Sequence, residues 1–557
     1  MSRAFGAMAL VAAVLAVASG CTADVPVEPS PSASTPAEPI ELPATDWLRV
    51  DRDEVADGGD LRLAVPTLPT NYNPYLADGL APGARDVIGP TTGGPLVFDE
   101  SGATIVDEDY ATSVEVTSQA PLVVEARLNP DAVWEDGTPI TVRDYIATWQ
   151  ALNGADPAYR PASTAGYESV GSVAEGEDEY HLVMTFAAPY ADWPALLTGV
   201  LKASIAGDPA VFNEGFVERG MPSSGPFVVT GIDVAGQVVT LERNPLWWGE
   251  TPKLDRILFR AVNEDGLGSS FSGDEIDAMR ISSNPDLAEA AESVDGAAIQ
   301  MARGGGWTNV LLNTGAGPLA DSSVREALAA MIDREQIADV ADAGLGLAAV
   351  AQGSFIFSPD QDGYVDDAPA HDPDAGANLL TAAGYSKEED SWVKDGEALE
   401  LTLTVPADSA TEQRRAEQIR DQLGEFGIPV EIASAPAATF FRDTVIAGDF
   451  ELATFSRAGS PFPISSSEAF FPLASASDFT GTTDAALGEL YDRAAAEVDA
   501  AARTEIANDI DRAIWAYVPM LPLATIPNVW AVREGLAGYG AAEYESIDWT
   551  SVGWIAA

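Results

Sequence analysis

Apolar residues recur along this chain with two different periods, and the two periods alternate. From 399 to 405 every second residue is leucine or valine, which predicts a strand with one buried face. Residues 411–426 carry charges around an apolar stripe at helical spacing, and Gly427 then ends the predicted helix before a second strand at 428–432. This strand–helix–strand order is typical of α/β layers, so we expect an α/β fold.

Two local motifs predict helix starts. Thr141 is followed three residues later by Asp144, a spacing in which each side chain bonds the backbone N–H of the other residue. Asp372 stands directly before Pro373, which is typical of the first turn of a helix. The helix after Thr141 carries a stripe that we expect to pack in the core, formed by Tyr145, Ile146, Trp149 and Leu152.

The chain is long and its composition is that of a globular protein. It has 557 residues, of which 46% are hydrophobic and 8% aromatic. A folded body of about 510 residues exceeds what one hydrophobic core supports, so we expect two or three domains. After the N-terminal segment no apolar run reaches about 18 residues, so no membrane span is expected in the processed protein.

The chain is strongly acidic, with a net charge of −58 from 87 acidic and 29 basic residues. Because nucleic acids and anionic lipid head groups are polyanions, the charge excludes them as partners of the general surface. The acids are spread along the whole chain. A field that attracts cationic ligands is one interpretation, and a solvated surface that keeps the protein dispersed is the simpler one.

The N-terminus has the pattern of a secretion signal. Arg3 precedes an apolar run at 7–16, and small residues then lead to Cys21, the only cysteine. This resembles the lipobox of bacterial lipoproteins, except that Ala18 stands where leucine is usual. We expect Cys21 to be lipidated and to hold the protein on the extracytoplasmic face of the cell membrane. The alternative is an ordinary signal peptide with an incidental cysteine.

The sequence offers little material for a catalytic or metal centre. His181 and His371 are the only histidines and lie far apart, which argues against a zinc site or a Ser/His/Asp centre. We predict no catalytic residue, no metal and no cofactor. An enzyme that uses carboxylate chemistry is kept as a third alternative.

Five blocks in a fixed order resemble the extracellular solute-binding proteins of family 5, which serve oligopeptide and dipeptide ABC importers. The resemblance covers roughly residues 58 to 540. The blocks are residues 134–145, 224–249, 273–277, 312–334 and 372–385.

The resemblance implies a fold similar to periplasmic binding proteins of type II, with two lobes, an additional domain and a discontinuous first lobe. It implies that a monomer closes over a peptide or related solute, leaves it chemically unchanged and docks on ABC permease subunits. The expected parts are a signal peptide (1–21), a Pro/Ser-rich spacer (22–57), the first lobe (58–96, 217–312 and 521–557), the additional domain (97–216) and the second lobe (313–520).

The resemblance also suggests which residues contact the ligand. In peptide-binding members an aspartate after a strand neutralises the amino terminus of the peptide, and Ser460 falls at that place here. Trp247 and Trp248 look structural. The predicted ligand-binding residues are Trp307, Asn309, Arg457, Ser460 and Phe462.

The missing acid leaves a second function open. A buried ammonium without a partner is costly, whereas Arg457 favours an anionic or hydroxyl-rich group. The other interpretation of Arg457 is a surface or interlobe ion pair. Actinobacterial lipoproteins of the LpqW type share this scaffold and are linked to mannosylated envelope lipids. The alternative is therefore an envelope lipoprotein that binds mannosylated glycolipid intermediates or regulates lipoglycan synthesis.

Overall fold

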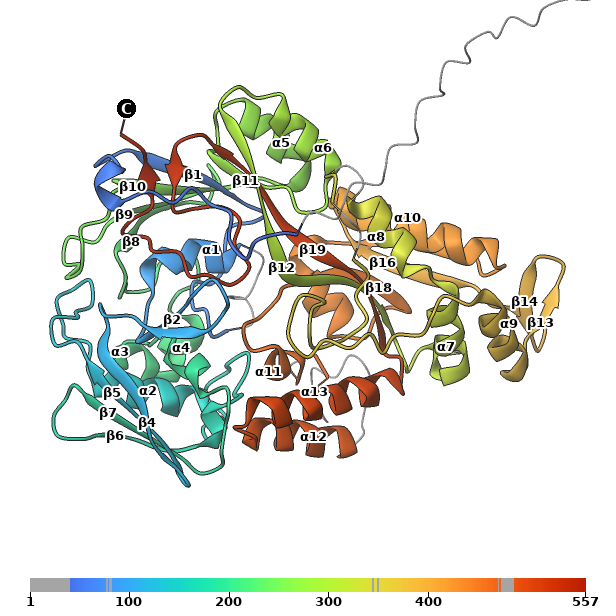
Figure 1. Ribbon diagram of the computed structural model, residues 1–557, viewed down its shortest axis with the longest axis horizontal. Helices are drawn as coiled ribbons and strands as arrows, with labels where there is room; N and C mark the ends of the chain where they lie inside the picture. Colours follow the sequence, from blue (N-terminus) through green and yellow to red (C-terminus); the bar gives the residue numbers. More distant parts are fainter. Residues whose placement is uncertain are drawn as a thin grey trace, which may run out of the picture. The chain divides into compact units, whose positions relative to one another are not determined.

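The computed structural model describes residues 41–76, 79, 83–342, 345–347, 350–468, 470–471 and 485–556 (Figure 1). The predicted signal peptide, Cys21 and the first part of the predicted spacer lie outside the described residues. Among the described helices, none combines the length and the apolar character that crossing a bilayer requires.

A mixed sheet of ten strands runs through the body, in the order β17-β16-β18-β12-β19-β11-β1-β10-β9-β8. Parallel and antiparallel pairs both occur, and helices pack on the sheet, so the expected α/β class is confirmed. Its strands are β1 (Asp60–Val65), β8 (Phe227–Asp233), β9 (Val238–Arg243), β10 (Arg256–Ala261), β11 (Ala278–Arg280), β12 (Ala297–Leu312), β16 (Leu401–Pro406), β17 (Val430–Ala435), β18 (Leu452–Arg457) and β19 (Met520–Arg533).

The long strands β12 and β19 connect two hydrophobic cores. They pair antiparallel, and Figure 1 shows them crossing the body as one ribbon pair. The register shifts between Ala302 and Gly306. A Cβ atom on Gly304 would lie 1.8 Å from the carbonyl oxygen of Ile526, so only glycine allows the two backbones to approach this closely.

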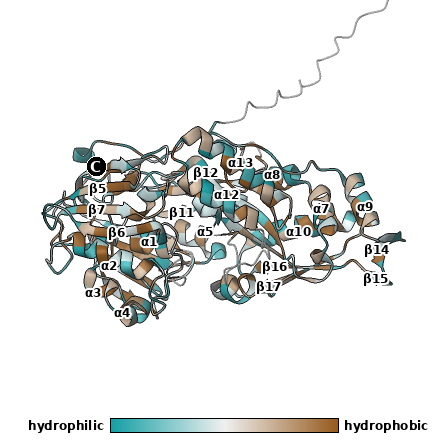
Figure 2. Cartoon of the chain, turned by 90° about the horizontal axis from the view of Figure 1, so that it is seen from below, coloured by the Kyte–Doolittle hydropathy of each residue, from teal (hydrophilic) through white to brown (hydrophobic). Residues whose placement is uncertain are grey.

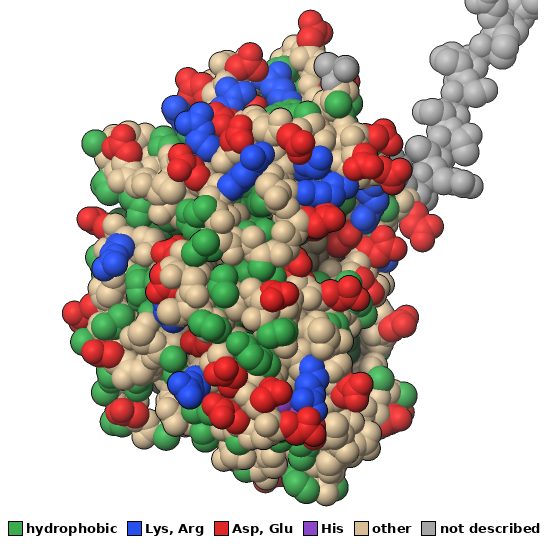
Figure 3. Space-filling view, turned by 90° about the vertical axis from the view of Figure 1, so that its left-hand side faces the viewer, with side chains coloured by type: hydrophobic (Ala, Val, Ile, Leu, Met, Phe, Trp, Pro, Cys, Tyr) green, Lys and Arg blue, Asp and Glu red, His purple; other side chains and the backbone are tan. Residues whose placement is uncertain are grey.

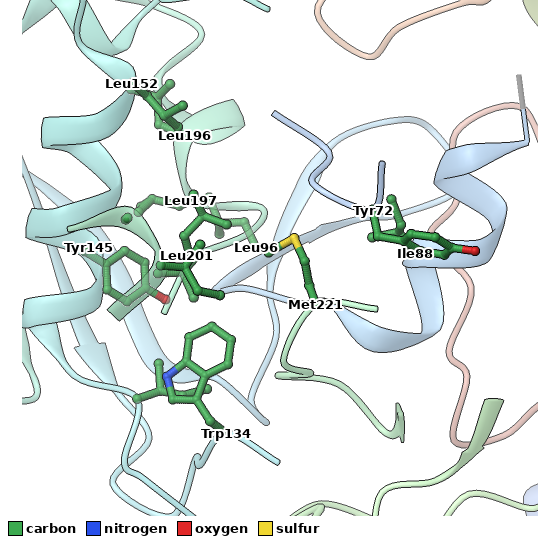
Figure 4. Close-up of a cluster of buried hydrophobic side chains, with 14 of the residues drawn as sticks. Tyr72, Ile88, Leu96, Trp134, Tyr145, Leu152, Leu196, Leu197, Leu201 and Met221 are labelled. Atoms are coloured by element: carbon green, nitrogen blue, oxygen red, sulfur yellow. The ribbon is translucent and has the colours of Figure 1, made fainter. Parts of the chain in front are cut away.

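The first core lies beside an antiparallel sheet in the order β4-β5-β7-β6. Its helix α2 (Val142–Leu152) begins with the predicted motif, in which Asp144 accepts from the N–H of Thr141 at 2.9 Å. Figure 4 shows part of this core, with Tyr145 and Leu152 of α2 among its side chains. The elements are β2 (Leu96–Phe98), β3 (Thr104–Val106), β4 (Ala111–Gln119), β5 (Leu122–Leu128), β6 (Val170–Glu175), β7 (His181–Phe186), α1 (Ala84–Ile88), α3 (Ala203–Ala206) and α4 (Pro209–Glu214).

The second core is built by strands β16 to β18 with helices on both sides. Helix α10 (Ala410–Glu425) buries Ala416, Ile419 and Leu423, and α9 (Pro373–Ala382) begins at Asp372, as the sequence predicts. The remaining elements are α5 (Glu264–Ser272), α6 (Pro285–Glu292), α7 (Ser322–Met331), α8 (Arg334–Asp342), α11 (Pro463–Glu468), α12 (Ala485–Ala496), α13 (Ala500–Trp515), β13 (Ser386–Glu388), β14 (Ser391–Lys394), β15 (Glu397–Ala398), β20 (Leu536–Ala537) and β21 (Gly553–Trp554).

The folded body begins within the range expected for the spacer. Thr45 bridges to Ala542, and Val55 bridges to Ile555. The N–H of Asp46 donates to the carbonyl of Ala541 at 2.9 Å. Residues 41–57 therefore lie against the C-terminal segment, and this part of the predicted spacer is wrong. The predicted lobe boundaries stay a prediction.

The surface agrees with the interpretation of the net charge as a solvated acidic surface. Figure 2 shows hydrophobic and hydrophilic residues interspersed along the strands and helices. On the face in Figure 3, acidic side chains are scattered among basic and apolar ones and do not gather in one patch. A dispersed distribution of this kind keeps a protein soluble without forming a single docking field.

Candidate ligand-binding site

Strands β12 and β18 bring two of the predicted site residues, Trp307 and Arg457, together. Trp307 of β12 lies opposite Arg457 of β18 in the antiparallel register, although the two residues are 150 positions apart in the sequence. Side chains of directly paired residues share one face of a sheet. The Arg457 guanidinium accordingly lies 5.3 Å from the ring centroid of Trp307, and both side chains are buried.

Arg457 is a buried cation held by neutral groups. Its exposed fraction is 7%, and its Nη1 and Nη2 donate to the carbonyl of Phe355 and to Oγ of Ser466, each at 3.2 Å. A second aromatic ring, that of Phe470, lies 4.3 Å from the guanidinium. Burial lowers the pKa of Arg457 to about 10. The side chain nevertheless stays charged at neutral pH.

The loop after β18 places Ser460 and Phe462 beside the bend in β12. Gly459 packs so closely on Gly305 that a Cβ atom there would meet backbone at 2.4 Å. Oγ of Ser460 accepts from the N–H of Phe462 at 3.1 Å, which fixes the start of the turn into α11. The ring of Phe462 meets Phe98 of β2 edge to face, with centroids 5.7 Å apart. This loop therefore contacts β2, whose Leu96 lies in the first core.

Asn309 occupies a different environment. It lies opposite Phe455 and is fully buried, with Nδ2 donating to the Phe455 carbonyl at 2.9 Å. Its backbone carbonyl accepts from the hydroxyl of Thr454. These contacts tie neighbouring strands together, so the structure gives Asn309 a place inside the sheet, apart from the other predicted site residues.

Three further contacts connect segments of the two cores near α11, and no sequence pattern predicts them. The hydroxyl of Tyr190 bonds Ser465, and the N–H of Ala191 donates to the carbonyl of Ala495 at 2.7 Å. Asp192 and Arg503 form an ion pair at 2.6 Å. We call these three contacts, together with Phe98–Phe462, the bridging contacts.

An acidic group lies beside the bridging contacts. Glu468 is the last residue of α11 and is exposed to solvent. Partial desolvation of its carboxyl by the surrounding protein, together with the charges of Glu168, Asp492 and Asp192, raises the pKa of Glu468 to about 7. The basic Arg457 and the acidic Glu468 thus lie at the two ends of one segment.

Trp247 and Trp248 have the structural surroundings that the sequence suggests. Nε1 of Trp248 donates to the carbonyl of Asp109 at 2.6 Å, and Nε1 of Trp247 donates to the carbonyl of Glu250 at 3.0 Å. The two rings pack on each other with centroids 4.3 Å apart. Both indole N–H groups are therefore satisfied by backbone.

Comparison with known proteins gives a consistent picture. The model of the bacterial extracellular solute-binding proteins, family 5 (middle), matches residues 106–478. The chain is 34% identical to the oligopeptide-binding protein OppA of Mycobacterium tuberculosis over 549 residues, covering 97% of this chain and 92% of that protein.

A second relative and a solved structure complete the comparison. The probable monoacyl phosphatidylinositol tetramannoside-binding protein LpqW of Mycobacterium tuberculosis is 26% identical, covering 78% of this chain and 72% of its own length. The periplasmic EDTA-binding protein EppA superimposes with a TM-score of 0.85 at 25% identity, covering 93% of this chain and 99% of that chain. The expected fold, similar to periplasmic binding proteins of type II, is thereby confirmed.

Proposed function

The chain belongs to the bacterial extracellular solute-binding proteins of family 5, and from this premise we propose that it binds an oligopeptide or related solute and delivers it to an ABC importer. The observation that carries the proposal is the 34% identity to an oligopeptide-binding protein over 97% of this chain. Proteins of this family are binding proteins, so the solute leaves chemically unchanged.

The ligand lies, in this proposal, where the loop after β18 meets β2. Trp307 supplies an apolar surface, Arg457 supplies a positive charge, and Ser460 and Phe462 line the turn. Support comes from the contact between Trp307 and Arg457, from the turn formed by Ser460 and Phe462, and from the bridging contacts. Asn309 holds the strands beneath them.

Lipidation of Cys21 completes the proposal by placing the protein outside the cytoplasmic membrane. Several relatives are named lipoproteins, which supports an anchor, and the composition of the N-terminus fits a signal with a following spacer. A monomer held on the membrane by a lipid on Cys21 can dock on ABC permease subunits in the same membrane.

A second function is favoured by one observation. The position where peptide-binding members carry an acid holds Ser460, and the described residues of the loop from 458 to 467 contain no carboxylate. The similarity to LpqW covers 78% of this chain, so a mannosylated phosphatidylinositol is the alternative ligand.

Thermal unfolding of the purified protein separates the two functions. We expect pools of synthetic peptides of two to nine residues to raise the melting temperature, because a ligand that binds only the folded state stabilises it. Phosphatidylinositol mannosides are tested in detergent in parallel. If only the phosphatidylinositol mannosides raise the melting temperature, the import proposal is contradicted.

A further inference from the structure

A pocket of about 580 Å³ lies beside the second core, where the chain enters β18. The loop before β18, the turn after β12 and one face of β16 line it. A volume of this size suits a small molecule. Glu451 lines the pocket directly before β18 and Arg457 ends that strand, so at about 3.3 Å per residue they lie about 20 Å apart. The pocket is therefore distinct from the site proposed above.

Two threonines of β16 present hydroxyl groups to this pocket. The side chains of Leu401, Leu403 and Val405 pack in the second core. Because side chains alternate along a strand, Thr402 and Thr404 face the other way, into the pocket. Thr404 is only 9% exposed, yet its hydroxyl has no hydrogen-bond partner among the described residues. Since buried hydroxyls are normally hydrogen-bonded, this one points to a partner that enters from solvent.

Two carboxylates give the same pocket a negative charge. Asp449 and Glu451 both line it, and within the described part of the chain neither forms an ion pair with a basic side chain. Oε2 of Glu451 accepts from the backbone N–H of Thr402 at 2.7 Å, which fixes this carboxylate beside β16. Nδ2 of Asn313 is occupied by two carbonyls of the loop before β18, at 3.1 and 2.8 Å. The pocket therefore offers a ligand mainly hydrogen-bond acceptors.

An organic cation matches these groups better than a metal ion does. Calcium takes roughly six to eight oxygen ligands, and the described residues contain no group of three or more acids, histidines or cysteines placed to hold a metal. The pocket is also much larger than a single ion requires. An ammonium or guanidinium group carries several N–H donors together with the opposite charge, which makes its hydrogen bonds to carboxylates strong.

We propose that this pocket is a second binding site, which takes a small molecule bearing an ammonium or guanidinium group. The cation pairs with Asp449 and Glu451, and the hydroxyl of Thr404 accepts one of its N–H groups. This inference goes beyond the proposed function and does not depend on it, because the proposed peptide site lies at the other end of β18.

Such a cation can be a free amine or the basic side chain of a peptide, and calorimetry with the full chain distinguishes the two sources. Agmatine carries an ammonium and a guanidinium group and no carboxylate. An arginine tripeptide blocked at both ends presents the same guanidinium on a peptide backbone, and 1,4-butanediol is the neutral control. We expect agmatine to bind at one site and butanediol to give no binding heat. Equally tight binding of the tripeptide at this pocket would show that a side chain also supplies the cation.

Substitutions in the pocket locate the binding. Glu451→Gln can still accept the N–H of Thr402 but loses the charge, and we expect it to weaken agmatine binding at least about fivefold. Thr404→Val keeps the shape of the side chain without the hydroxyl and should weaken binding about threefold. Glu115→Gln, at an exposed residue of β4 in the first core's sheet, removes the same charge and should bind like the wild type.

The outcomes decide the inference independently of peptide import. If agmatine does not bind the wild type, or binds all variants equally, the second site is overturned and the proposed peptide site is unaffected. Asp449→Asn, at an exposed residue of the pocket, repeats the test if Glu451→Gln does not fold. Binding of synthetic peptides without basic residues should be the same in the wild type and in the pocket variants.

Discussion

Glu468 is a carboxyl beside acids from both sides of the bridging contacts. Two of the acids near it, Glu168 and Asp192, belong to the first core's segments, while Asp492 lies on α12. Burial raises the pKa of Glu468 from an ordinary value of 4.5 to about 7, and the three acids act in the same direction. The conformation with the bridging contacts therefore binds a proton that the separated or unfolded chain releases.

The sign of the pH dependence follows from this shift. Between about pH 4.5 and 7 the carboxyl is protonated in the bridged conformation and ionised in the unfolded chain, so stability falls as pH rises through this window. Above about pH 7 the stabilising contribution of the protonated Glu468 carboxyl is fully lost. Glu468→Gln should flatten this part of the curve, measured as melting temperature from pH 5 to 8.

Other carboxyl groups also contribute to the pH dependence of stability, and their effects must be distinguished from that of Glu468. Burial also raises the pKa of Asp511 to about 7 and that of Asp107 to about 6, and these shifts have the same sign. The difference between wild type and Glu468→Gln isolates the one carboxyl. Parallel curves for the two proteins would show that Glu468 does not titrate in this range.

At the scale of elements, the crossing of β12 and β19 depends on glycine. A Cβ atom on Gly304 would lie 1.8 Å from the carbonyl oxygen of Ile526. Gly304→Ala must therefore separate the two strands, and we expect a loss of about 2 kcal/mol or more in the free energy of unfolding. Urea titration of the wild type and of Gly304→Ala measures this difference in the free energy of unfolding.

Gly424 provides a matched control for this substitution. It lies in α10, and no atom stands within 4 Å of a Cβ added there. Gly424→Ala should be neutral or stabilise the protein by up to about 1 kcal/mol, since alanine favours a helix. If both alanine variants unfold at the same denaturant concentration, the close crossing of the strands is not essential to stability.

Elements were predictable where the signal is local. Asp372 before Pro373 and Gly427 after the charged stripe mark helix ends by backbone chemistry alone, and α9 and α10 lie where those residues place them. Residues 41–57 were assigned to the spacer because the family resemblance begins only at about residue 58. Their folding depends on hydrogen bonds to a segment about 500 residues away, such as Asp46 to Ala541, which no local pattern contains.

The candidate site was predictable only in part for the same reason. The family resemblance led to Trp307 and Arg457, and the structure pairs them across β12 and β18. The burial of Arg457 against Trp307 and the contact of Phe462 with Phe98 arise from packing between distant segments. Tyr190 and Glu468 carry no motif, so sequence reasoning missed them.

At the scale of the whole molecule, the bridging contacts hold the two cores together. The strongest is the ion pair of Asp192 with Arg503, because the Asp192 side chain is only 3% exposed. Arg503→Gln leaves that carboxylate buried without its partner, which typically costs about 3–5 kcal/mol. We expect the cores to separate more often, measured as a larger radius of gyration in solution scattering.

A control on the neighbouring helix tests whether this effect is specific. Arg493 is exposed on α12 and changes the net charge by the same amount when replaced by glutamine. Arg493→Gln should leave the radius of gyration unchanged. Equal values for both variants and the wild type would mean that the pair does not control the distance between the cores.

The central claim is that this chain holds a peptide and releases it intact, and native mass spectrometry tests it directly. The protein is incubated with the pools of synthetic peptides of two to nine residues, and the masses of the complex and of the recovered peptides are measured. The account predicts one peptide per chain with every peptide mass unchanged. Absence of any complex, or recovery of peptides shortened by hydrolysis, would contradict it.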